Sequence, residues 1–226
     1  MQKQFRYVKI DNTTNLDIVE STTTETGRVY KHPEGKKYPS ITTVMSWSKK
    51  DVIKKWRAAV GEEEANKVTR IATSRGTAIH DMCERYLRNN PNYCEDGNYT
   101  RELEFASIKQ ILDQSVDDIY CLETALYSDH LGVAGKTDCI AHYNGQRAVI
   151  DFKTARKYKK KEHIDTYFMQ ATAYAIMFEE LTQIPIPKIV IMINVAGEDT
   201  FVFEEKRNNY VDQLRDTIRE YNLLSN

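Results

Sequence analysis

The feature that most constrains this chain is the pair Asn144-Gly145, which stands between two apolar runs. An Asn-Gly pair in this setting predicts a two-residue type I′ turn and therefore an antiparallel β-hairpin. Counting outward from the turn, Asp138 faces Asp151, and directly opposed side chains share one face of a sheet with Cβ atoms roughly 4.5–5.5 Å apart. Lys153 lies two residues beyond Asp151 and points to that face too. The turn thus gathers two carboxylates and an ammonium on one surface.

Two carboxylates this close repel each other unless a cation lies between them, and a divalent metal is the simplest candidate. Mg²⁺ and Mn²⁺ prefer oxygen ligands, which Asp138, Asp151 and the backbone carbonyl of Phe152 would supply. Lys153 would then position a metal-bound water, help to deprotonate it, or stabilise charge on a phosphate. This arrangement suits phosphodiester hydrolysis.

The alternative interpretation is an ion-pair row on an exposed edge strand. The apolar residues 148–150 and Phe152 argue against it, because a strand this apolar is typical of a central position. The chain contains two further (D/E)-x-K triplets, at residues 34–36 and 204–206, but neither has an acid opposite it across an Asn-Gly turn. The chemistry is therefore expected at residues 151–153.

Composition limits the class of protein. With 226 residues, of which 41% are hydrophobic and 29% charged, the chain can bury a core as one large domain, with or without a small extension. No apolar run approaches 18 residues, so we expect no membrane span. The N-terminus lacks the charged segment followed by an apolar segment that is typical of a signal peptide, so we expect no signal peptide. The four cysteines form no C-x-x-C pair, which argues against a zinc site and favours a reducing cytosol.

Charge is unevenly distributed, although the net charge is only −1. Residues 153–161 carry six Lys or Arg and no acid, and residues 49–57 carry five against one Asp. Such basic stretches on a neutral chain favour a phosphate-binding groove, and a solvated surface is the alternative.

Periodicity and turn signals predict a mixed sheet with helices on its faces, which is an α/β (α+β) fold. Residues 1–40 are expected to form a β-rich extension, and residues 41–226 the main domain. Ser40 is expected to cap one helix and Asp51 a second that ends at Gly61. The expected helices are 62–89 (interrupted near residues 74–76), 102–118, 163–182 and 207–224. The expected strands are 5–10, 28–31, 120–127, the two strands of the hairpin, 188–195 and 201–203.

Several segments together resemble the PD-(D/E)XK nucleases, specifically the RecB-like exonuclease branch, whose core is like that of restriction endonucleases. The match extends over roughly residues 40–195. Its blocks, in order, are Arg75-Gly76-Thr77-Ala78-Ile79-His80, Gly135-Lys136-Thr137-Asp138, Ile150-Asp151-Phe152-Lys153-Thr154 and Gln170-Ala171-Thr172-Ala173-Tyr174.

The resemblance implies roles for five further residues. His80 would be a metal ligand or a proton carrier. Glu84, one turn later, would orient His80 or approach a second ion, and is otherwise an exposed helix charge. Glu123 would lie at the site, or simply pair with a nearby Lys or Arg. Gln170 and Tyr174 share a helix face and would brace the site or contact the nucleic-acid backbone, with ordinary packing as the alternative.

The predicted function is Mg²⁺- or Mn²⁺-dependent DNA exonuclease activity with one or two ions, in DNA processing, recombination or repair. The residues expected to contact DNA are Arg75, Thr154, Arg156, Lys157, Lys159, Lys160 and Lys161. Some RecB-like nucleases hold an iron–sulfur cluster through downstream cysteines; none follows Cys139, so no cluster is expected. The resemblance implies a phage or mitochondrial setting, and the start of the chain favours the cytoplasm of a bacterial or phage-infected cell.

Two other functions stay open at this point. One is a nucleic-acid-binding module that keeps the nuclease fold without catalysis, and the other is a structure-specific endonuclease. Trp47 and Trp56 are expected in the core, with base stacking as the alternative.

Overall fold

A computed structural model of the chain describes residues 3–10, 16–25, 27–94 and 99–224. Its centre is a five-stranded sheet of order β4-β5-β6-β7-β8, in which β6 and β7 run parallel and the other neighbours antiparallel. The strands are β4 (Val116–Ser128), β5 (Val133–Tyr143), β6 (Gln146–Ala155), β7 (Lys188–Val195) and β8 (Thr200–Lys206). The predicted mixed sheet, and with it the α/β class, is confirmed.

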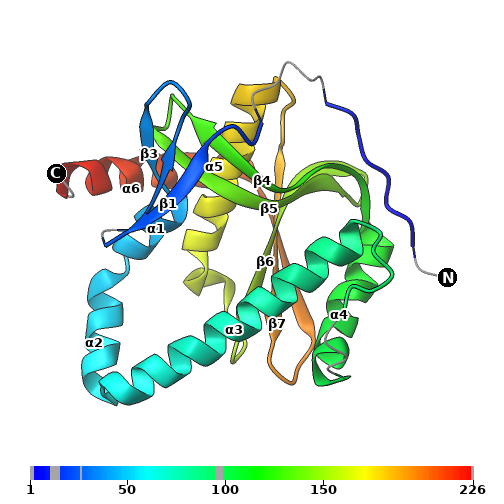
Figure 1. The fold of residues 1–226 in the computed structure, drawn as a ribbon, viewed down its shortest axis with the longest axis horizontal. Helices are drawn as coiled ribbons and strands as arrows, with labels where there is room; N and C mark the ends of the chain where they lie inside the picture. The colour runs from blue at the N-terminus through cyan, green and yellow to red at the C-terminus, as the bar shows by residue number, and fades with distance from the viewer. Residues whose placement is uncertain (1–2, 11–15, 26, 95–98, 225–226) are drawn as a thin grey trace.

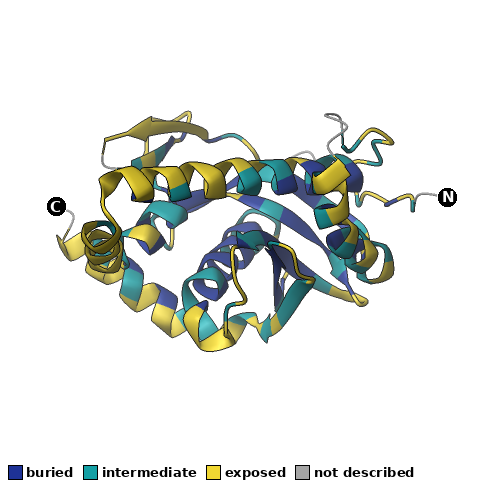
Figure 2. Ribbon diagram, turned by 90° about the horizontal axis from the view of Figure 1, so that it is seen from below, coloured by how far each residue is buried: buried dark blue, intermediate teal, exposed yellow. Residues whose placement is uncertain are grey.

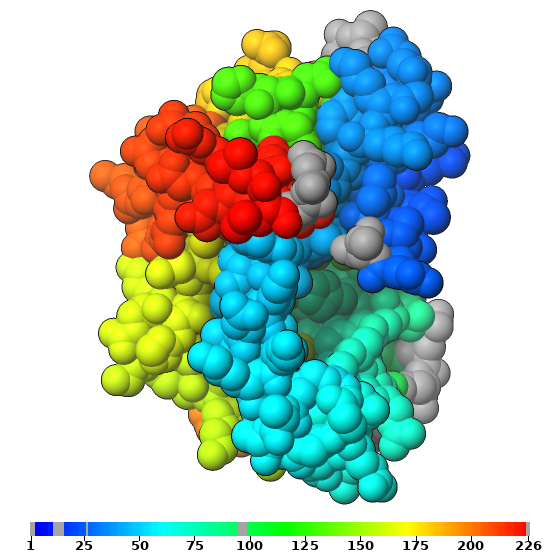
Figure 3. Space-filling view, turned by 90° about the vertical axis from the view of Figure 1, so that its left-hand side faces the viewer, coloured from blue at the N-terminus to red at the C-terminus, as the bar shows by residue number. Residues whose placement is uncertain are grey.

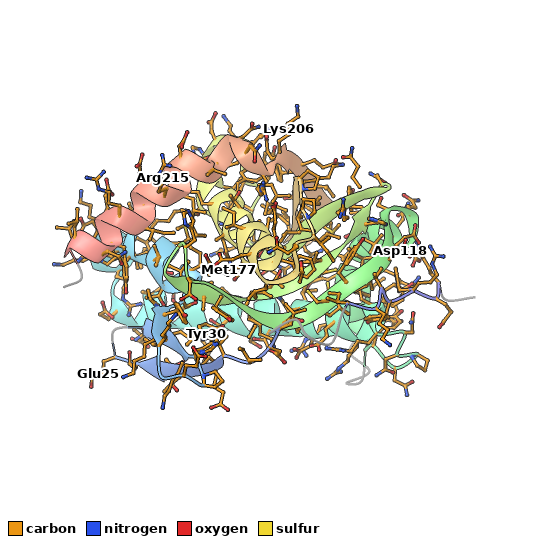
Figure 4. The ribbon with its side chains drawn as sticks, turned by 90° about the horizontal axis from the view of Figure 1, so that it is seen from above. Glu25, Tyr30, Asp118, Met177, Lys206 and Arg215 are labelled. Carbon is orange, nitrogen blue, oxygen red and sulfur yellow. The ribbon has the colours of Figure 1, made fainter. Side chains whose placement is uncertain are left out.

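Helices cover both faces of this sheet, as Figures 1 and 4 show. On one face α5 and α6 pack with α1, and on the other α3 and α4 cover the strands. The helices are α1 (Ile41–Trp47), α2 (Lys50–Val60), α3 (Glu62–Leu87), α4 (Tyr99–Ser115), α5 (Asp165–Thr182) and α6 (Val211–Leu224), with 3-10 turns η1 (Lys161–His163) and η2 (Arg207–Tyr210). Each face buries its own apolar cluster, so the sheet is the middle layer of three.

The N-terminal part contains a second, three-stranded antiparallel sheet, which confirms its predicted β-rich character. Its strands are β1 (Glu20–Thr24), β2 (Gly27–Lys31) and β3 (Lys37–Pro39). Tyr30, labelled in Figure 4, is buried with Tyr38 and Tyr127 where this small sheet meets the large one. The strand predicted over residues 5–10 is wrong, since Tyr7 makes only an isolated bridge to Ile119. The division at residue 40 stays a prediction.

Helix α3 is continuous, and the interruption predicted near residues 74–76 is wrong. Glycine in a helix costs about 1 kcal/mol relative to alanine, which is why the sequence suggested a break. Tertiary contacts overcome this cost. The Arg75 guanidinium donates to the backbone oxygens of Ala155 and Asn194, and a Cβ at Gly76 would stand 3.5 Å from the Thr154 hydroxyl. That distance is an ordinary van der Waals contact, so the Arg75 hydrogen bonds, and not the absence of a Cβ at Gly76, account for the continuous helix.

Two predicted boundaries also differ. Residues 116–118 begin β4 instead of ending a helix, because Val116 is buried in the sheet's apolar cluster. Ser40 caps α1 as predicted, accepting from the Thr42 N–H at 3.3 Å. Asp51, however, lies within the first turn of α2. Its negative charge interacts favourably with the positive end of the helix dipole, but its side chain does not cap the helix.

Helix α2 and the first half of α3 stand away from the sheet. Figure 2 shows them largely exposed, and α2 buries none of its residues. In the space-filling view of Figure 3 the surface is hollowed beside α2. None of the helices in the described ranges has the length and apolar character needed to cross a bilayer.

Candidate active site

The predicted hairpin and its register are confirmed. Asn144 and Gly145 both have positive φ, 49° and 77°, as a type I′ turn requires. Tyr143 pairs with Gln146, and the ladder continues to Cys139 opposite Ile150. Asp138 and Asp151 are the next residues on each strand.

The two strands separate at the aspartates. Beyond Cys139 and Ile150 the ladder between β5 and β6 ends, while β6 stays paired with β7 and β5 with β4 (Figure 1). The N–H of Phe152 donates instead to Asp138 Oδ2 at 2.8 Å. Asp138 therefore lies in a fork between two strands, where groups from both faces of the sheet can reach it.

Asp151 is a buried carboxylate with few partners. It is 1% exposed, and apart from the Lys153 ammonium no described residue donates a hydrogen bond to either oxygen. Its contact is an ion pair with Lys153. Burial raises the pKa of Asp151 to about 6, since Lys153 offsets only part of the desolvation and Asp138 adds repulsion. Such an incompletely satisfied buried carboxylate is what a cation site requires.

The Lys153 side chain is more exposed than the carboxylate that it contacts, 19% against 1%. Burial would lower the pKa of Lys153, but Asp151 and Asp138 together raise it. The ammonium also lies 5.4 Å from the ring centroid of Tyr167 on α5. Lys153 is therefore held in its charged form.

His80 reaches the fork from α3. Its Nδ1 lies 3.5 Å from Asp138 Oδ1. Burial would lower the pKa of His80, but the Asp138 charge raises it. Burial would likewise raise the pKa of Asp138, yet His80, Lys153 and the Phe152 N–H together lower it. The two groups stabilise each other's charged forms.

Glu123 completes the group from β4. It adopts a left-handed conformation with φ 48°, uncommon for a residue other than glycine, and its carboxylate lies 2.8 Å from Lys136 Nζ. Burial is the main cause that raises the pKa of Glu123, with Lys136 opposing it. Backbone strain of this kind is typical of functional sites.

Three of these residues could hold a metal ion. Single ligand atoms of His80, Glu123 and Asp138 all lie within 4.8 Å of one another. The two carboxylates suit Mg²⁺ or Mn²⁺, and the imidazole is a ligand that transition ions such as Mn²⁺ accept more readily than Mg²⁺ does. The group includes His80 and Asp138, which were predicted as ligands, and Glu123, which was predicted only as supporting. Asp151 and the Phe152 carbonyl stay predicted ligands. The donors present thus fit a divalent ion.

The other supporting residues have partners of their own. Glu84 pairs with Arg88 at 2.9 Å, one turn along α3. Gln170 donates to the Tyr174 hydroxyl at 2.9 Å in a buried pair on α5. Tyr174 packs so closely on Gly135 that a Cβ there would lie 2.7 Å from its ring. The α5 pair therefore supports the strand that carries Asp138.

Several of the residues expected to bind DNA have contacts within the chain. Arg75 is bound by Glu104 at 3.1 Å and by the buried Asn194. Lys159 donates to the Tyr167 hydroxyl at 2.6 Å, and Lys161 forms an ion pair with Glu205.

The remaining basic residues and the tryptophans differ in exposure. Arg156, Lys157 and Lys160 are exposed. Trp47 packs edge-on against Tyr221. The core position predicted for Trp56 is wrong, since this residue lies on α2 and is 37% exposed.

The ion pair of Glu123 with Lys136 is the alternative that the sequence left open for this acid, and the position of Lys136 inside the Gly135–Asp138 block is the signal that could have singled it out. Another feature of the site has no such signal. The Arg75–Asn194 contact joins residues 119 positions apart, and no local pattern reveals such a pair.

Comparison with known proteins bears on this site. No protein-family model matches the chain. Over 148 residues it is 29% identical to Mitochondrial genome maintenance exonuclease 1 of Homo sapiens, covering 60% of this chain and 42% of that protein. For the Mus musculus protein of the same name the identity is 26% over 129 residues, covering 54% and 38%. The chain thus spans about two fifths of the length of these relatives.

Among solved structures, a candidate exonuclease from Eubacterium rectale aligns with a TM-score of 0.46 and 13% identity, covering 65% of this chain and 64% of that one. The sequence likeness to the two mitochondrial exonucleases extends over part of each protein.

Proposed function

We propose that this chain is a divalent-metal-dependent DNA exonuclease of the PD-(D/E)XK type, RecB-like branch. The observation that carries the proposal is the fork, where Asp138, Asp151 and Lys153 meet His80 from the opposite face of the sheet. The sequence likeness to exonucleases supports the same reaction class.

The ion would be Mg²⁺ or Mn²⁺, held by His80, Glu123 and Asp138, with Asp151 and the Phe152 carbonyl as further oxygen ligands. When bound, such an ion polarises a phosphate oxygen and lowers the pKa of a coordinated water. Asp151 supports this assignment because the Lys153 ammonium is the one described partner of its buried carboxylate, which leaves oxygen lone pairs for an ion.

Lys153 would stabilise negative charge on the scissile phosphate. The raised pKa of this lysine, with Asp151 and Asp138 beside it, favours an ammonium over a proton-accepting amine. Of the roles considered for Lys153, charge stabilisation and orientation of the attacking water therefore fit better than deprotonation. His80, held by Asp138, would keep its ring directed at the scissile phosphate.

The DNA backbone would approach along the loop after β6. Thr154, Arg156, Lys157 and Lys160 follow Lys153 in sequence, and the last three are exposed. We include Lys159 and Lys161 as contributors to the positive potential, and Arg75 as a support of this end of β6.

The direct test is degradation of end-labelled single-stranded and duplex DNA with Mg²⁺, Mn²⁺ or EDTA. We expect cleavage only with metal, and a loss of at least about a hundredfold in Asp151→Ala and Lys153→Ala. Asp212→Ala on α6, whose side chain is 87% exposed, is the matched control and should cleave normally. Retained cleavage in both site variants would refute the proposal.

Two further substrates separate the alternatives. A closed circular DNA should resist an exonuclease and be opened by a structure-specific endonuclease. Calorimetry with DNA in EDTA identifies a binding module, since tight DNA binding without any metal-dependent cleavage would assign the chain to that class.

A further inference from the structure

A pocket lies beside the proposed active site, between α3 and the ends of β6 and β7. It has a volume of about 360 Å³, within the range of ligand sites. Its apolar walls are Val68, Ile71, Ala72, Ala155 and Ala196. No role in the proposed chemistry uses these side chains.

Part of the apolar wall of the pocket faces solvent. Ile71 is 58% exposed, a large aliphatic side chain left facing solvent. Polar groups surround the apolar walls. Lys67 and Glu64 both line the pocket and contact each other at 3.9 Å, and Arg75 and the exposed Arg156 add two further cations, so the edge carries three basic groups against one acid. An apolar floor with cations at its edge fits a ligand that has a flat apolar part joined to an anion.

Its position relates it to the reaction. Thr154, in the pocket lining, follows Lys153 on β6, and its side chain lies on the opposite face of the sheet, which is the face that α3 and His80 cover. Ala72 lies eight residues before His80 on the continuous α3, which is about 12 Å at 1.5 Å per residue. A pocket at this distance lies within reach of a nucleotide next to a phosphate at the fork.

We propose that the pocket is a nucleobase subsite that receives one unpaired base of the DNA strand being cleaved. The base lies against Val68, Ile71 and Ala72, the Thr154 hydroxyl is available to its polar edge, and Arg156 contacts the adjoining phosphate. The inference rests on the proposed function, and it names residues that the catalytic group does not include.

Binding of oligodeoxynucleotides with one abasic position, moved stepwise along the strand, tests the subsite. Anisotropy is measured in the Lys153→Ala background, where the strand is expected to persist. We expect binding to weaken about fivefold to tenfold at one or two adjacent positions, as loss of about 1 kcal/mol of apolar contact requires.

Filling the pocket is the second arm. Ala72→Leu places a larger side chain at an exposed helix position, and leucine is a good helix former there. It should weaken binding of the intact strand and remove the sensitivity to the abasic position. Ala106→Leu, at an exposed position of α4 outside this pocket, is the matched control and should change neither.

The possible outcomes distinguish failure of the proposed subsite from failure of the proposed nuclease activity. Normal metal-dependent cleavage with equal binding at every abasic position overturns the subsite and leaves the nuclease. Absence of cleavage by the unmutated chain overturns both. A dimer in sedimentation that Ala72→Leu dissociates would assign the pocket to a second copy of the chain, and would overturn the subsite as well.

Discussion

Replacing Asp151 by Asn should make the metal-free protein more stable while abolishing cleavage. Asp151 is buried, and its pKa is raised from 3.8 to about 6 by desolvation. The folded state therefore binds this proton more tightly than the unfolded chain does. As pH rises from about 4 to about 6, ionisation of Asp151 progressively destabilises the fold.

The size of the effect follows from the two pKa values. The gap of about two pH units corresponds to about 3 kcal/mol, at about 1.36 kcal/mol per unit. An asparagine resembles the protonated acid and avoids this cost, and Asp138 remains near Lys153 as a counter-charge. At pH 8 the variant should gain at most about 3 kcal/mol, and at pH 4 almost nothing.

Urea unfolding in EDTA between pH 4 and pH 8 measures this difference directly. Asp212→Asn is the matched control, because it makes the same chemical change at a side chain that is 87% exposed. A variant at Asp151 that is less stable than the parent at pH 8 would refute the reasoning. So would a stability difference that does not grow between pH 4 and pH 6.

Further predictions concern the supports of the site. Gly135→Ala should cost about 1–3 kcal/mol in urea unfolding, because its Cβ would lie 2.7 Å from the Tyr174 ring; an unchanged midpoint would contradict this packing. Lys136→Ala should tighten Mn²⁺ binding about fivefold in calorimetry, since it removes a cation that competes for Glu123, worth about 1 kcal/mol; weaker binding would count against Glu123 as a ligand. Arg75→Lys should speed hydrogen exchange in α3, because an ammonium lacks the planar fork that spans its partners; unchanged exchange would show that these contacts do not hold the helix.

Local signals predicted much of the architecture. The strand over residues 188–195 was predicted with the bounds that the structure has, because a short, continuously apolar run is typical of a buried strand. Ser40 was predicted as a cap from its residue type and position. In both cases the signal lies within a short stretch of sequence, although β7 itself pairs with the distant β6, which is why both could be predicted without a structure.

Predictions failed where distant contacts outweighed local preference. The break expected near Gly76 is absent because Arg75 ties α3 to strands far along the chain. The helix expected to reach residue 118 ends earlier because Val116 is drawn into the sheet. In both cases packing between separate elements outweighs a propensity difference of about 1 kcal/mol.

The sequence by itself determined that Asp138 and Asp151 would be neighbours, because Asn144-Gly145 sets the hairpin register through its own backbone conformation. Only the tertiary structure decided that the strands part at those residues, and that His80 and Glu123 meet Asp138 within the gap. The first result depends on two residues of a turn. The second depends on how a helix and three strands pack, which no single segment encodes.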